Sequence, residues 1–169
     1  MADVTNSTLF KNIEGIQNLK DALFVLVKTE WNEAIVNELE RGCLTLLHQY
    51  GIKTKTITVP GAVEIPFAVK QCWKYYKKAS EVKAFITLGC IVRGDTPHFD
   101  YVCQSVTAGV SALNIKLPVP VIFGVLTVNN DEQARERIGG KHGHKGEEAA
   151  VTAIKMALLK NEFKSGSVK

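Results

Sequence analysis

The sequence predicts an α/β protein in which one parallel sheet lies between two layers of helices. Segments with the pattern of a buried strand alternate with segments whose apolar residues recur at helical spacing. Such alternation is typical of strand–helix–strand units, which build a parallel sheet covered on both faces. The 169 residues contain no internal repeat and no linker long enough to separate two domains. We therefore expect a single three-layer α/β/α sandwich.

Four segments are predicted to form the strands. Residues 23–27 are continuously apolar, as expected for a strand buried on both faces. Residues 54–59 alternate polar with apolar positions and are rich in β-branched side chains. The other two strands are expected at residues 83–88 and 119–127. Four parallel strands are most simply arranged as a flavodoxin-like sandwich.

Helical periodicity occupies the intervals between and after these strands. The predicted helices cover residues 33–50, 64–78, 99–116, 131–138 and 145–163. Gly51 is well placed to end the first helix, and Asn129 or Asn130 to cap the fourth.

Both ends of the chain lack strong periodicity. We divide the sequence into an N-terminal arm (1–22), a domain (23–163) and a flexible tail (164–169). The edge of a sheet is a liability that a neighbouring chain can cover. The arm could therefore add a strand to the sheet of a neighbouring subunit.

Composition disfavours several classes of protein. Hydrophobic residues make up 46% and charged residues 22%, an ordinary globular mixture. No apolar run approaches the ~18 residues that span a bilayer, and no secretory leader is visible. The net charge of +4 is mild, and no nucleic-acid, dinucleotide or P-loop motif accompanies it. We expect a cytoplasmic protein without membrane or nucleic-acid partners.

The four cysteines show no CxxC pair, which indicates reduced structural thiols. Cys90, His98 and Asp100 could form a cysteine-nucleophile set, but the apolar surroundings of Cys90 disfavour it. His142 and His144 lack a nearby third ligand, so we expect no metal and no cofactor.

In an open parallel sheet, ligands bind outside the carboxyl ends of the strands. The segments that follow the predicted strands are residues 29–32, 60–64, 90–98 and 127–130. All four carry polar, aromatic or glycine residues, and this convergence predicts the site. Trp31, directly after a strand, is placed to stack on a flat ring, although tryptophan is more often a core residue.

The third of these segments is the most informative. Gly94 permits close backbone approach, Thr96 suits a helix cap, and Pro97 suits the first helical position. Amides at such a helix start would hold a phosphate. His98 would then lie beside the anion as the candidate for proton transfer, or it could simply hydrogen-bond near the cap.

Two basic residues flank a glycine-rich segment later in the chain. Arg137 ends the predicted fourth helix, and a guanidinium can grip phosphate through two parallel hydrogen bonds. Lys145 could add a point charge. A basic, solvated loop explains the same residues equally well.

The chain resembles the lumazine synthase family at these positions. The resemblance extends from about residue 23 to 163, with matching blocks at residues 30–32, 59–66, 89–102, 120–127 and 143–150. It implies condensation of 5-amino-6-(ribitylamino)uracil with 3,4-dihydroxy-2-butanone 4-phosphate in riboflavin biosynthesis, a transferase reaction without cofactor or metal. The pyrimidine amine gives an imine with the ketone, phosphate leaves, and ring closure yields the lumazine.

The resemblance also implies roles for individual residues. His98 is the general acid and base. The pyrimidine and ribityl group contact Trp31, Asn32, Ala62, Val63, Glu64, Cys90, Ile91, Val92 and Phe123, the last from a neighbouring subunit. The phosphate contacts Gly94, Asp95, Thr96, Arg137 and Lys145.

Three positions depart from the commonest family pattern. Trp31 replaces a more frequent phenylalanine, and Pro97 stands where threonine is common. Asp95 puts a carboxylate near the phosphate, so its side chain must point away.

The resemblance implies a homo-oligomer, with riboflavin synthase as a further partner. The family forms pentamers that can assemble into sixty-subunit icosahedral shells, and the short 139–146 turn favours the shell. The alternative is a non-catalytic flavin-binding protein on the same fold. His98 with Arg137 distinguishes the two, because riboflavin has no phosphate.

Overall fold

A computed structural model describes residues 8–11, 13, 15–76 and 82–166 of the chain, with the side chains of 164 and 165 left out. At its centre is a parallel sheet in the order β2-β1-β3-β4. The strands are β1 (Leu23–Thr29), β2 (Lys53–Val59), β3 (Val82–Val92) and β4 (Val121–Val128). The predicted four-stranded parallel sheet is confirmed.

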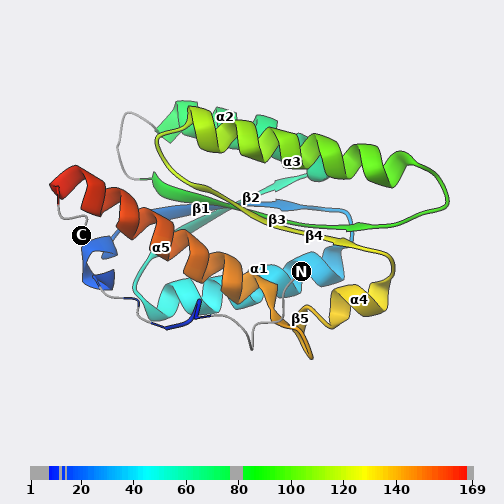
Figure 1. Ribbon diagram of the computed structural model, residues 1–169, viewed down its shortest axis with the longest axis horizontal. Helices are drawn as coiled ribbons and strands as arrows, with labels where there is room; N and C mark the ends of the chain where they lie inside the picture. The colour runs from blue at the N-terminus through cyan, green and yellow to red at the C-terminus, as the bar shows by residue number, and fades with distance from the viewer. Residues whose placement is uncertain (1–7, 12, 14, 77–81, 167–169) are drawn as a thin grey trace.

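Helices cover both faces of the sheet (Figure 1). One face carries α1 (Glu33–Gln49) and α5 (Lys145–Ser165), and the other carries α2 (Ile65–Tyr76) and α3 (His98–Lys116). Side chains of β1 alternate between the two layers: Phe24 and Leu26 join the α1/α5 core, whereas Val25 and Val27 join the α2/α3 core. This confirms the three-layer α/β/α sandwich.

The segment after β4 differs from the prediction of a helix over 131–138. Helix α4 (Asp131–Arg135) is shorter, and an antiparallel hairpin of β5 (Ile138–Gly140) and β6 (Gly143–His144) follows it. Gly139 and Gly143 adopt φ of 110° and 75°, a backbone region that an L-residue would occupy only with strain. Ile138, inside the predicted helix, instead pairs with His144 across this hairpin, so the predicted continuation to residue 138 is wrong.

Strand β3 extends to Val92 instead of ending at residue 88, because Cys90, Ile91 and Val92 pair with the end of β4. Those residues therefore belong to the strand, not to the segment after it. The second predicted helix is divided into η3 (Ala62–Glu64) and α2, and the last continues to Ser165 before Gly166 at φ 68°. Residues 77 and 78 lie outside the described part of the chain.

The two outer strands, β2 and β4, form the edges of the sheet. Part of the expected arm is described: η2 (Ile16–Leu19) places Leu19, 1% exposed, in the α1/α5 core. The arm's first residues, which we expect to reach a neighbour, lie outside the described residues. Within the described residues, no helix has the length and apolar character of a membrane span.

Candidate functional site

Trp31 and Glu64 lie side by side where β1 and β2 end. Trp31 is 73% exposed, an unusual position for so large an apolar ring. A Cβ placed on Gly61 would lie 3.5 Å from Cδ1 of Trp31 and 3.0 Å from Oε2 of Glu64. Glycine therefore leaves room for an exposed aromatic face beside a carboxylate.

Asn32 links the segment after β1 to strand β3. It adopts the left-handed conformation, with φ 58°, which asparagine tolerates better than most residues. Its Nδ2 donates a hydrogen bond of 2.7 Å to the carbonyl oxygen of Cys90. The hydroxyl of Thr29 donates to the carbonyl oxygen of Trp31 at 3.2 Å. The backbone that carries the indole is thus bonded to the ends of both β1 and β3.

Ala62, Val63 and Glu64 form the single turn η3 at the end of β2, with Val63 and Glu64 exposed. Cys90 is instead buried in β3, and burial raises its thiol pKa to about 11. A thiol with this pKa stays protonated at neutral pH, which argues against a cysteine nucleophile.

An exposed loop connects β3 to α3. Gly94, Asp95, Thr96 and His98 are all exposed, and no described atom lies within 4 Å of a Cβ placed on Gly94. Helix α3 begins at His98, so Pro97 precedes the helix and does not open it. Thr96 Oγ1 accepts a hydrogen bond of 3.4 Å from the His98 N–H. The predicted anion loop and histidine therefore lie together at an open helix start (Figure 1, right).

Arg93 is a residue of this loop that the sequence reasoning missed. Its guanidinium carbon lies 4.1 Å from the centre of the Phe99 ring, and Nη2 donates to Asp100 Oδ1 at 3.1 Å. Nε donates to Oδ1 of Asn129, after β4, at 3.2 Å. Arg93 therefore joins the loop, the first turn of α3 and the end of β4.

Arg137 lies just beyond α4 and connects to the same network. Its Nη1 donates to the carbonyl oxygen of Gln133 at 2.7 Å, and Gln133 Oε1 accepts from the backbone N–H of Asn129 at 2.9 Å. Asn130 caps α4 by accepting from the Gln133 N–H, which confirms one of the two expected caps. The arginine is thus linked to the loop through Gln133, Asn129 and Arg93.

Phe123 and Lys145 lie elsewhere, in a groove of about 590 Å³ along β4 and α5. Phe123 is 40% exposed and sits opposite Thr87, well before the end of β4. Lys145 Nζ donates to both carboxylate oxygens of Glu148, at 2.7 and 2.8 Å, with 7% of its side chain exposed. The structure gathers these residues with each other and not with the 94–96 loop. Sequence reasoning also missed Glu148.

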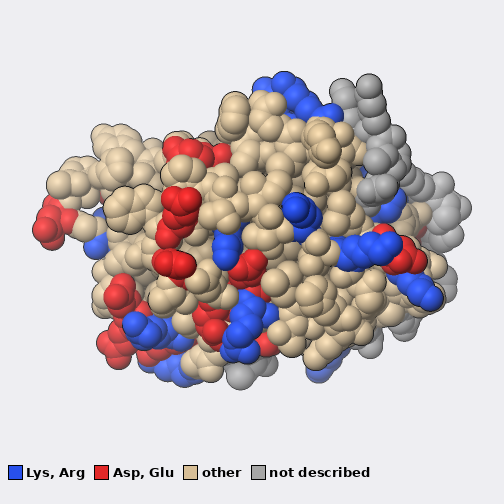
Figure 2. Space-filling model, turned by 180° about the vertical axis from the view of Figure 1, so that it is seen from behind, with Lys and Arg blue, Asp and Glu red and all other residues tan. Residues whose placement is uncertain are grey.

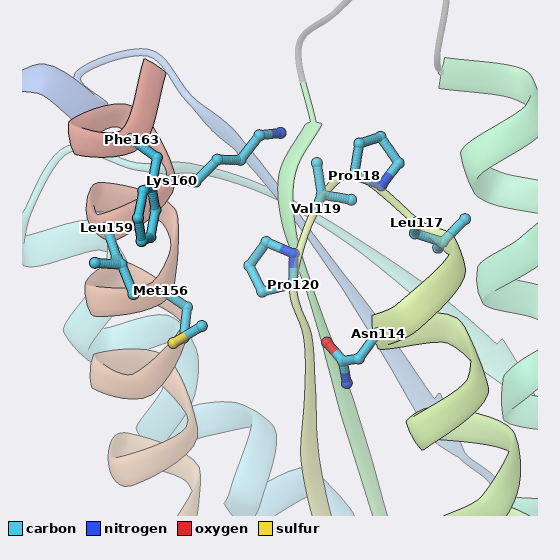
Figure 3. A pocket seen from close by; sticks show the side chains of 9 residues that line it. All are labelled: Asn114, Leu117, Pro118, Val119, Pro120, Met156, Leu159, Lys160 and Phe163. Carbon is cyan, nitrogen blue, oxygen red and sulfur yellow. The ribbon is translucent and has the colours of Figure 1, made fainter. Parts of the chain in front are cut away.

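A second cavity, of about 500 Å³, opens between the C-terminal turns of α3 and α5 (Figure 3). Its lining is Asn114, Leu117, Pro118, Val119, Pro120, Met156, Leu159, Lys160 and Phe163. None of the sequence-predicted site residues is among them, although Asn114, Pro120 and Met156 also line the groove that contains Phe123.

On the face shown in Figure 2, basic and acidic side chains are interspersed and form no single basic stripe. Among the described residues, no group of three His, Cys, Asp or Glu side chains could hold a metal ion. His142 instead lies 3.6 Å from Glu136, and His144 packs between helices.

Comparison with known proteins identifies close relatives over most of the chain. The family model for 6,7-dimethyl-8-ribityllumazine synthase matches residues 21–161. A protein of that name from Porphyromonas gingivalis is 49% identical over 149 residues, covering 86% of this chain and 90% of the relative. Those from Phocaeicola vulgatus and Cytophaga hutchinsonii are 41% and 46% identical, covering 93% and 83% of this chain and 93% and 88% of the relatives.

Proposed function

Because the chain belongs to the family of 6,7-dimethyl-8-ribityllumazine synthases, we propose that its active site surrounds Trp31, Glu64 and His98. The chain is a transferase of riboflavin biosynthesis. It condenses 5-amino-6-(ribitylamino)uracil with 3,4-dihydroxy-2-butanone 4-phosphate. The observation that supports this site is the convergence, at the carboxyl end of the sheet, of an exposed indole, a carboxylate and an open loop that leads to His98.

The pyrimidine stacks on Trp31, whose exposed ring offers a flat apolar face. The adjacent Glu64 accepts hydrogen bonds from the ribityl hydroxyls, and Ala62 and Val63 line the same side. Asn32 supports this arrangement through its hydrogen bond to the carbonyl oxygen of Cys90. The backbone groups of Ile91 and Val92, at the end of β3, border the pyrimidine ring. These contacts would fix the amine that attacks the ketone.

The phosphate binds the backbone of Gly94, Asp95 and Thr96 at the start of α3, where the helix dipole favours an anion. Open space beside Gly94 and the exposure of this loop support that assignment. Arg137 supplies the cation; among the described residues its guanidinium donates one hydrogen bond, and it carries five N–H donors.

His98, in the first turn of α3, moves protons between the reacting groups. Imine formation requires a proton on the departing water, and both phosphate loss and ring closure require further proton transfers. An exposed imidazole next to the anion loop can reach these atoms without rearrangement of the core.

A neighbouring subunit completes the pocket with Phe123. This residue is part-exposed near the start of β4, whereas the loop lies at the carboxyl end of the sheet, so one chain does not close its own site. Lys145 and Glu148 line the same groove as Phe123 and would contact the neighbour's substrates together with it.

The assembly that brings the groove to the loop is a pentamer, and sixty-subunit shells are the favoured higher form. The edge strand β2 is where the N-terminal arm of a neighbour would add a strand. Riboflavin synthase, which uses the product, remains a proposed partner.

Incubation of the purified protein with both substrates tests the function directly. Growth of the lumazine absorbance, dependent on both substrates, is the expected result. A protein that binds riboflavin tightly but forms no lumazine would instead match the non-catalytic alternative.

A further inference from the structure

The His144 imidazole, which has no role in the site above, is enclosed between two helices. Its Nδ1 accepts a hydrogen bond of 3.2 Å from the backbone N–H of Gly146 and caps the first turn of α5. Only 9% of the side chain is exposed. The ring fills a notch that Gly42 leaves in α1, where a Cβ would lie 2.6 Å from both ring nitrogens. The imidazole therefore fastens the start of α5 to α1.

Glu38 of α1 faces the other ring nitrogen, Nε2. Nε2 of His144 lies 3.7 Å from Oε1 of Glu38. Arg41 donates hydrogen bonds to both carboxylate oxygens and lowers the pKa of Glu38, which keeps the carboxylate charged. The ring therefore contacts α1 through Gly42 and Glu38, while its Nδ1 accepts from the Gly146 N–H of α5.

The same segment holds Arg137 in place. His144 pairs with Ile138 across the β5–β6 hairpin, directly after Arg137. The backbone N–H of Lys145, the residue after His144, donates to the carbonyl oxygen of Arg137 at 2.9 Å. Displacement of His144 from its notch would therefore displace the backbone of Arg137.

We propose that His144 is a positioning residue that places Arg137 for the phosphate of the four-carbon substrate. The proposal rests on the role assigned to Arg137 above. Its consequence is selective: loss of the cap weakens binding of the phosphorylated substrate, while the pyrimidine pocket around Trp31 is unaffected.

Steady-state kinetics of two substitutions at His144 test this proposal. His144→Ala removes both the acceptor and the ring, and KM for the butanone phosphate should rise about fivefold or more. His144→Asn keeps an acceptor atom at the position of Nδ1, so KM for the same substrate should stay within about twofold of the wild-type value. Both variants should retain kcat and KM for the pyrimidine, and thermal unfolding checks that each is folded.

Gly42→Ala tests the contact between α1 and the His144 ring by a change on the α1 side. Alanine is the better helix former, so a harmful effect must come from collision with the ring. We expect Gly42→Ala alone to raise KM for the butanone phosphate. Combined with His144→Ala, which removes the ring, it should raise that KM no further than His144→Ala alone, and this non-additivity reports the contact.

Arg137→Ala separates this proposal from the proposed function. If Arg137→Ala raises KM for the butanone phosphate but His144→Ala does not, His144 has no positioning role and the phosphate assignment stands. If Arg137→Ala leaves that KM unchanged, both assignments are wrong. If His144→Ala changes KM for both substrates and kcat together, the effect is a general defect and the positioning proposal is wrong.

Discussion

The exposure of His98 makes it the clearest single-residue test of the mechanism. Its side chain lies at the surface in the first turn of α3, so His98→Ala opens no cavity in the core. General acid and base catalysis is worth about 10²–10⁴-fold, and we expect a rate loss near 10²-fold because amine and ketone condense readily once held together. Initial rates of lumazine formation measure it, with oligomer size as the control. An unchanged rate would remove His98 from the mechanism.

Trp31 offers a spectroscopic test of the pyrimidine pocket. If the ring stacks on the heterocycle, a product analogue or riboflavin should quench tryptophan fluorescence. Trp31→Ala should abolish most of this quenching, whereas substitution of Trp73 on α2 should preserve it. Quenching that depends on Trp73 instead would place the heterocycle elsewhere on the molecule.

The position of an individual residue relative to the sheet was predictable where its place in the chain was enough. Trp31 and His98 follow strands, and a residue after a parallel strand lies at the carboxyl end whatever else surrounds it. Arg93 was missed because it links the loop to other elements through contacts with Phe99 and Asn129, and only the folded chain brings these residues together. Glu148 was missed for the same reason, since a carboxylate in the first turn of a helix has an ordinary role without the cavity beside it.

At the level of elements, long periodic segments were predicted well and short ones were not. The buried run that became β1 and the helix α1 carry enough residues to show their period. Strands β5 and β6 contain three and two residues, too few for any alternation to be visible. The end of β3 was missed because strand pairing with β4, not local pattern, determines how far it extends.

Close packing of α2 against α3 gives an element-scale prediction. A Cβ placed on Gly109 of α3 would overlap Pro66 and lie 2.9 Å from its Cβ. Gly109→Ala should therefore force the two helices apart, and overpacking of this kind costs about 1–3 kcal/mol. Thermal unfolding should show a lower midpoint for Gly109→Ala than for Thr107→Ala, an exposed substitution on the same helix. Equal midpoints would mean that the helices shift without cost.

At the scale of the whole molecule, we predict a protein that works only as an assembly. Among the described residues β2 has a strand neighbour on one side only, and Phe123 lies near the start of β4, whereas His98 follows the carboxyl end of β3. Light scattering on a size-exclusion column should give roughly one megadalton for sixty copies of the 18.6 kDa chain, since closed symmetry satisfies such contacts between copies. A mass of about five chains would indicate an isolated pentamer. An active single chain would contradict the shared site.

Complementation between two damaged variants tests the shared site more directly than mass does. His98→Ala damages the part of each site that the loop before α3 provides. Phe123→Ala damages the part that the groove of the neighbouring chain provides. In a mixed ring, a site is intact wherever the loop of a Phe123→Ala chain meets the groove of a His98→Ala chain, about a quarter of the sites at equal mixing. Dissociating the two variants together and reassembling them should therefore give activity above the mean of the separate preparations. Each variant reassembled alone is the control. Activity equal to that mean would show that His98 and Phe123 act within the same chain, because no mixed site could then be whole.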